Sequence, residues 1–104
     1  MKLFHFRKKI TFSDLIGKTV LVGFTYYTAD NELVERKQFW GTVTHSDEKQ
    51  ILVRQSDGEI LSLPPDLSST KRARPGEYRL HTTGEVVVDP DYLITWNITR
   101  TKEQ

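Results

Sequence analysis

Apolar side chains alternate with other side chains along most of this 104-residue chain. In the run 18–27, Val20, Val22 and Phe24 fall at every second position, and the run 92–101 alternates in the same way. A period of two residues is typical of an extended strand with one buried face, because successive side chains point to opposite sides of the backbone. The pattern therefore predicts an all-β protein.

The composition supports the same fold class. Threonine occurs 12 times and alanine only at positions 29 and 73. Branched and aromatic side chains suit a pleated sheet, whereas alanine is the best helix former. The length suits one domain, so we expect a single domain, 1–104, with an N-terminal arm over 1–17 and a β-barrel core over 18–101.

Short turns separate the alternating runs. Asp57-Gly58 and Thr83-Gly84 have the glycine that tight hairpins need at positive φ. The longest connection, 64–76, is polar and basic, and we expect it to cross an open end or one edge of the sheet. Ser13 and Gly17 are positioned to cap and to stop a single helical turn. The predicted strands are 18–27, 34–44, 50–55, 59–63, 77–82, 85–88 and 92–101.

These elements predict a small, strongly bent antiparallel sheet or an SH3-like barrel with an N-terminal arm, since closure removes exposed strand edges. The stretches 17–22 and 39–43, followed by the Asp57-Gly58 hairpin and its end at 61–64, resemble SH3-like and Tudor-like barrels in the order of their strands. That resemblance is one of pattern and covers the middle half of the chain.

A second resemblance is local. The stretch Arg74-Pro75-Gly76-Glu77-Tyr78-Arg79-Leu80, followed by 83–87 and 89–93, is similar to a segment of small uncharacterised bacterial proteins. It implies a bacterial family without implying any activity.

Composition also excludes several classes of protein. The chain has no cysteine, which excludes disulfides, a thiolate nucleophile, cysteine-type zinc sites and iron–sulfur clusters. Its formal net charge is +1, so no global field draws it to nucleic acid or to a membrane. No apolar run approaches the ~20 residues of a membrane span. The first nine residues lack the order of a secretory signal, and we expect a cytoplasmic protein.

No set of residues predicts catalysis. The histidines at 5, 45 and 81 do not have the spacing of a local metal site, and neither a Gly-x-Ser-x-Gly motif nor a phosphate-binding glycine loop is present. Paired acids such as Asp47 and Glu48 lie at predicted turns, where Asp commonly bonds the backbone. We therefore expect no enzyme, no catalytic residue, no metal and no cofactor.

The candidate binding residues are basic or aromatic. If Phe39 and Val43 point inward, alternation directs Trp40 outward beside Arg36. The ring then has two possible roles: it is covered by Phe4, Phe6 or Ile10 of the arm, or it stacks on a ligand. The candidate site residues are Arg36, Trp40, Arg72, Arg74 and Arg79.

The function predicted from these features is that of a non-enzymatic binding module. We expect it to engage a protein partner or an extended polymer across one barrel face and the connection 64–76. The alternative is a nucleic-acid-binding barrel that uses the same five candidates, with phosphate contacts and base stacking. A small enzyme is the least favoured alternative. The sequence identifies neither the partner nor the oligomeric state.

Overall fold

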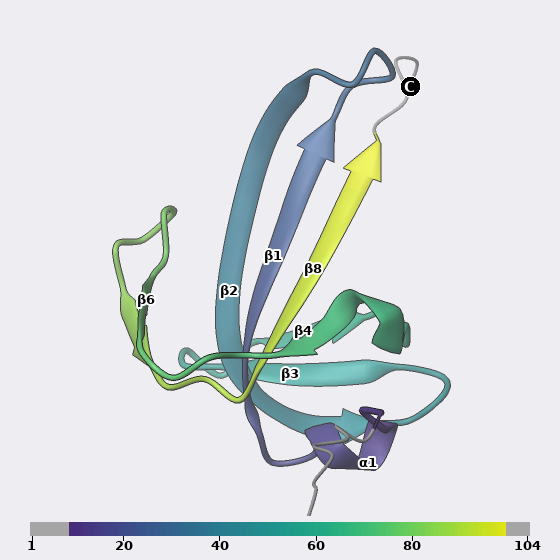
Figure 1. The fold of residues 1–104 in the computed structure, drawn as a ribbon, viewed down its shortest axis with the longest axis vertical. Helices are drawn as coiled ribbons and strands as arrows, with labels where there is room; N and C mark the ends of the chain where they lie inside the picture. Colours follow the sequence, from purple (N-terminus) through teal and green to yellow (C-terminus); the bar gives the residue numbers. More distant parts are fainter. Residues whose placement is uncertain (1–8, 100–104) are drawn as a thin grey trace, which may run out of the picture.

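The structure is a computed structural model that describes residues 9–99. It confirms the all-β class: the described residues form eight strands, one short α-helix and one 3-10 turn, joined by turns and loops (Figure 1). In chain order the elements are α1 (Phe12–Leu15), β1 (Thr19–Tyr27), β2 (Leu33–Ser46), β3 (Ile51–Gln55), β4 (Ile60–Leu63), η1 (Leu67–Ser69), β5 (Thr70–Arg72), β6 (Glu77–Arg79), β7 (Val86–Val88) and β8 (Tyr92–Thr99).

Six strands form the main sheet, in the order β4-β3-β2-β1-β8-β5, and β6 and β7 form a separate hairpin. Strands β1 to β4 are antiparallel neighbours, and β5 is antiparallel to β8. Within the described residues the sheet is open, with β4 and β5 as its two end strands. The connection that holds η1 and β5 runs along one edge of the sheet, which is one of its two predicted courses.

The prediction of a wholly antiparallel sheet is wrong for one pair, because β8 runs parallel to β1. The turn after β7 brings the chain back to the end of the sheet where β1 begins. There the Asp91 backbone N–H donates to the Thr19 carbonyl at 2.8 Å, and the Thr19 N–H donates to Asp91 Oδ2 at 2.9 Å. Both strands therefore start side by side and run the same way.

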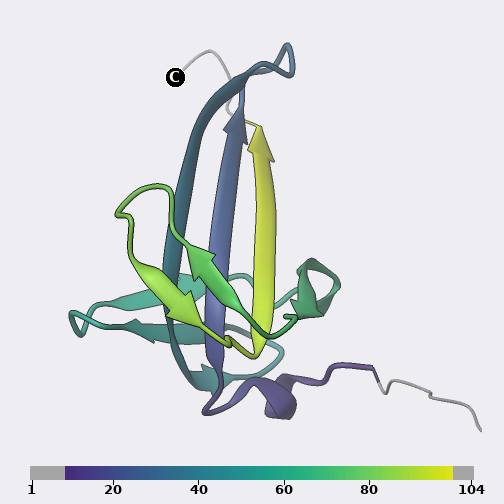
Figure 2. The same cartoon turned by 60° about the vertical axis from the view of Figure 1, so that its left-hand side comes forward.

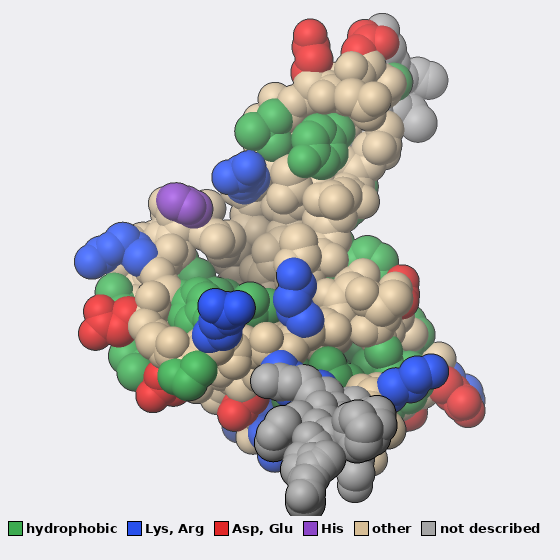
Figure 3. Space-filling view, in the orientation of Figure 1, with side chains coloured by type: hydrophobic (Ala, Val, Ile, Leu, Met, Phe, Trp, Pro, Cys, Tyr) green, Lys and Arg blue, Asp and Glu red, His purple; other side chains and the backbone are tan. Residues whose placement is uncertain are grey.

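The sheet bends strongly along β2 (Figure 1). Gly41 lies where β2 passes from pairing with β1 alone to pairing with both β1 and β3. A β-carbon there would overlap the Arg54 backbone carbonyl, so the strands approach closely only because Gly41 has no side chain. The part of β2 before Gly41 extends away from the body together with β1 and β8 as a three-stranded blade, defined by residues 23–27, 33–38 and 95–99 (Figures 1, 2 and 3).

The main apolar core lies on the face of the sheet that carries Val20 and Val22, which we call the core face. The segment before β1 closes it: Leu15 is completely buried, and Ile10 and Phe12 pack against it. Helix α1 is capped by Thr11 rather than by Ser13, through a capping box with Asp14. The buried members of this core are Leu15, Val20, Val22, Val43, Ile51, Val53, Leu63, Tyr92 and Ile94.

Candidate functional site

A second, smaller apolar cluster covers Trp40 on the opposite face of the sheet, which we call the hairpin face. Leu21, Trp40 and Leu93 are register partners across β1, β2 and β8, so they form one row. Leu80 and Val87 of the β6–β7 hairpin, which are almost fully buried, pack on this row, as does Tyr78. The chain thus buries an apolar row that alternation had directed outward.

The prediction that the N-terminal arm covers Trp40 is wrong for Ile10. Ile10 packs against the main core, on the other face of the sheet. Phe4 and Phe6 lie outside the described residues. The hairpin provides the cover because its own alternation places apolar side chains towards the row. Trp40 remains only partly buried, and its remaining surface lines a cleft.

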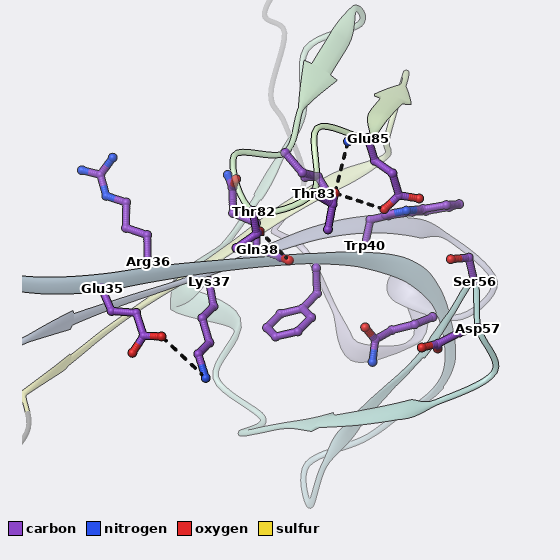
Figure 4. A pocket seen from close by; sticks show the side chains of 13 residues that line it. Glu35, Arg36, Lys37, Gln38, Trp40, Ser56, Asp57, Thr82, Thr83 and Glu85 are labelled. Atoms are coloured by element: carbon purple, nitrogen blue, oxygen red, sulfur yellow. Dashed lines mark hydrogen bonds and ion pairs between the residues drawn. The ribbon is translucent and has the colours of Figure 1, made fainter.

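This cleft has a volume of about 450 Å³ and follows the outer edge of β2 (Figure 4). One wall is the hairpin tip, and the other is the turn between β3 and β4. The sequence predicted both of these turns, but it did not predict that they line a cleft. The lining residues are Glu35, Arg36, Lys37, Gln38, Phe39, Trp40, Gln55, Ser56, Asp57, Leu80, Thr82, Thr83 and Glu85.

The bottom of the cleft is the edge of a strand. Strand β2 pairs with β3 only from Gly41 onward, so no described strand pairs with its outer edge from Arg36 to Trp40. The Thr82 hydroxyl donates a long hydrogen bond of 3.5 Å to the Gln38 carbonyl. At least one backbone acceptor of this edge is therefore directed into the cleft.

Gln38 also fixes the hairpin tip to the blade. Its side-chain Oε1 accepts a short hydrogen bond from the His81 backbone N–H, 43 residues away in sequence. Inside the hairpin, the Leu80 N–H donates to the Glu85 carbonyl and the Gly84 N–H donates to the Leu80 carbonyl, both at 2.8 Å. These bonds define the conformation of the tip, which forms one wall of the cleft.

Charge is distributed unevenly along the cleft. Arg36 and the Glu35–Lys37 ion pair, 3.9 Å apart, lie towards the blade (Figure 4). The carboxylates of Asp57 and Glu85 lie at the other end, near Trp40 (Figure 4). The Glu85 Oε1 accepts from the Thr83 hydroxyl at 3.4 Å. The Trp40 end thus presents an aromatic ring beside negative charge.

The five sequence candidates do not form one site. Arg36 and Trp40 line the cleft, whereas Arg72 lines a separate groove of about 470 Å³ at the base of β8. The Arg79 Nη1 donates to the Gly84 carbonyl within the hairpin at 3.0 Å, and Arg74 is exposed. Arg36 and Arg72 lie apart because Arg36 is on β2 and Arg72 is on β5, and strands β1 and β8 lie between these two strands in the sheet.

Other titratable groups stabilise local turns. Asp47 accepts hydrogen bonds from the Lys49 N–H at 2.8 Å and from His45 Nε2 at 2.7 Å. These bonds hold the pKa of Asp47 below its usual range, and the bond from the Lys49 N–H has the largest effect. The described residues contain no group of three or more His, Cys, Asp or Glu side chains that could hold a metal ion. His5 lies outside them.

Comparison with known proteins gives no relative. No family model, curated protein or solved structure matches the chain. The resemblances to SH3-like and Tudor-like barrels and to small bacterial proteins stay predictions. Among residues 9–99 the structure has no helix that is both long and apolar enough to cross a membrane.

Proposed function

We propose that this protein is a non-enzymatic binding module whose partner is a protein, and that an extended segment of the partner binds in the cleft beside Trp40. The single observation that carries the proposal is the strand edge from Arg36 to Trp40 at the bottom of that cleft. An unpaired strand edge between two walls suits β-strand addition, in which main-chain hydrogen bonds give affinity and side-chain contacts give specificity.

The alternation of β2 determines what such a segment meets. Trp40 and Gln38 belong to the hairpin face, and Phe39 belongs to the core face. A partner strand in register with β2 would direct successive side chains to opposite faces in the same way. One set would contact Trp40 and the hairpin tip, and the other would contact Phe39 and the β3–β4 turn.

The charges near Trp40 define one feature of the partner. Asp57 and Glu85 are both exposed and both line that end of the cleft. A Lys or Arg of the partner would be attracted by both carboxylates and by the face of the indole ring. We therefore propose an extended segment with apolar residues and a basic residue placed beside Trp40.

Two further points complete the proposal. A cytoplasmic location fits a chain without cysteine, since small secreted domains are commonly rich in disulfides.

A nucleic acid is the less favoured partner, because Glu35, Asp57 and Glu85 outnumber the two basic residues of the lining and would repel phosphates.

The test is a selection of random extended peptides on the wild-type protein. Peptides that bind are expected to carry a basic residue and to slow amide hydrogen exchange at residues 36–40. Glu85→Lys should weaken them about three- to tenfold, because one surface attraction becomes a repulsion. Glu77→Lys is the matched control, since Glu77 is exposed on the same hairpin and does not line the cleft.

Three results would contradict the proposal: no peptide is selected, protection appears away from β2, or both variants weaken binding equally. Binding of single-stranded oligonucleotides at low salt, declining log-linearly as salt rises, would replace it with the nucleic-acid alternative.

A further inference from the structure

The blade has a second unpaired edge, on β8. Strand β5 pairs with β8 only at its first three residues, Tyr92 to Ile94. From Thr95 to Thr99 the inner edge of β8 pairs with β1, and no described strand pairs with its outer edge. This edge lies on the opposite side of the blade from the cleft of β2.

The two edges of the blade differ in how they are protected. Natural sheets discourage edge-to-edge association with charged residues, proline or bulges. On β2 the three consecutive charged residues at 35–37 discourage pairing with another blade, whereas residues 38–40 beside the cleft carry no charge. The β8 edge over 95–99 has no charged residue, no proline and no register shift. It retains the features of a strand that accepts another strand.

The sequence of this edge is chemically symmetric about Asn97. It reads Thr-Trp-Asn-Ile-Thr, so residues at equal distances from the centre are of the same kind. In an antiparallel pair of two such strands related by a two-fold axis at Asn97, Thr95 faces Thr99 of the other copy and Trp96 faces Ile98. Thr–Thr and aromatic–β-branched neighbours are both stabilising cross-strand pairs.

The faces of the blade agree with this register. Trp96 and Ile98 lie on the core face and are partly buried, whereas Thr95, Asn97 and Thr99 lie on the hairpin face and are exposed. The two-fold pairing therefore places apolar residues beside apolar residues on one face and polar beside polar on the other. The next position along the ladder would be Ile94, which Thr70 of β5 already occupies, so the structure itself limits the pairing to these five residues.

We infer that the partner of this edge is a second copy of the chain. The two copies pair β8 with β8 over residues 95–99, antiparallel and centred on Asn97, so that two three-stranded blades become one six-stranded sheet. The interface is isologous, as a two-fold dimer requires. Its ladder is short, so the dimer is expected to dissociate on dilution. The β2 edges stay at the outside of the combined sheet.

The test uses the position that faces itself across the axis. Asn97→Lys and Asn97→Asp each place two like charges on side chains whose β-carbons are about 4.5–5.5 Å apart, which destabilises the pair. Sedimentation velocity over a concentration series should show a dimer for wild type and a monomer for each variant alone. An equimolar mixture of the two variants should recover the dimer, because opposite charges then face each other.

The control variants carry the same charges elsewhere. Thr44 is exposed on β2 in the body of the protein, so Thr44→Lys and Thr44→Asp should dimerise as wild type does. Circular dichroism checks that each variant is folded, which is expected because Asn97 is exposed. A wild type that stays monomeric at every concentration, or two Asn97 variants that stay monomeric when mixed, overturns the inference. So does a dimer that neither Asn97 variant disturbs, which would point to another surface.

Discussion

Gly41 is the residue at which the path of β2 depends most directly on the absence of a side chain. Its φ is ordinary, so the requirement is one of space rather than of backbone conformation. The obstacle is the carbonyl of Arg54, which belongs to the backbone of β3 and cannot turn aside. A methyl group at this position must therefore separate β2 from β3 or distort the bend.

We expect Gly41→Ala to lower the free energy of unfolding by about 1–3 kcal/mol, the usual cost of overpacking a close contact. The measurement is equilibrium denaturation by urea. Gly23→Ala is the matched control on β1, because a β-carbon there meets nothing within 4 Å and the backbone is not at positive φ. Its stability should stay near that of wild type. Equal stability of the two variants would show that the close approach at Gly41 is unimportant.

Asp47 links stability to pH at the turn between β2 and β3. Its carboxylate accepts from the backbone of Lys49 and Gln50 and from His45, and these bonds lower its pKa in the folded state. A lowered pKa means that the folded protein holds the ionised form more strongly than the unfolded chain does. The resulting stabilisation is complete above the unfolded pKa, near 4, and is lost as the pH falls through the lower folded pKa.

Asp47→Ala should therefore be less stable than wild type at pH 7, and the difference should shrink as the pH is lowered below about 4. Denaturation curves at several pH values measure the difference, and an NMR titration of the carboxyl carbon measures the pKa directly. An Asp47 that titrates at or above its ordinary value would contradict the expectation, as would a difference in stability that does not depend on pH.

At the scale of single elements, alternation predicted most strands because a sheet with covered faces imposes a period of two. The runs around β1, β3, β4 and β8 fold as expected, and the Asp57-Gly58 turn joins β3 to β4. Alternation carries no information on strand direction, which is why the parallel pairing of β8 with β1 was missed. Contacts between residues far apart in sequence accompany that direction, among them the hydrogen bond from the Thr19 N–H to Asp91, 72 residues away.

The candidate site was predictable only in part, because alternation gives the direction of a side chain but not its distant neighbours. The outward direction of Trp40 and its proximity to Arg36 follow from local alternation. The partners of Trp40 do not, because Leu80, Glu85 and Asp57 come from distant turns that tertiary packing brings to the edge of β2. The sequence signal was the apolar run at 86–88, of which Val87 is buried in the smaller cluster while Val86 and Val88 are exposed.

At the scale of the whole molecule, one sheet separates two apolar clusters of unequal size. Among residues 9–99, the core-face cluster has nine buried residues and the hairpin-face cluster has three. The two arms of the hairpin are closed at its base, where the Asp89 N–H donates to the Gly76 carbonyl, and beyond it the Ala73 N–H donates to the Asp91 carbonyl. A unit held by two buried side chains of its own, Leu80 and Val87, and by the hydrogen bonds of its tip to Gln38 can open locally while the larger cluster stays packed.

Leu80 and Leu63 allow this division to be tested, because each is almost fully buried, one in each cluster. Leu63→Ala should lower global stability by about 2–5 kcal/mol, since it leaves a cavity in the main core. Leu80→Ala should instead release the hairpin: amide exchange should accelerate over β6 and β7, and Trp40 fluorescence should shift to longer wavelength, while the amides of β1 to β3 stay protected. Equal loss of protection in both units would show that the two clusters unfold together and that the wall of the cleft is part of a single cooperative fold.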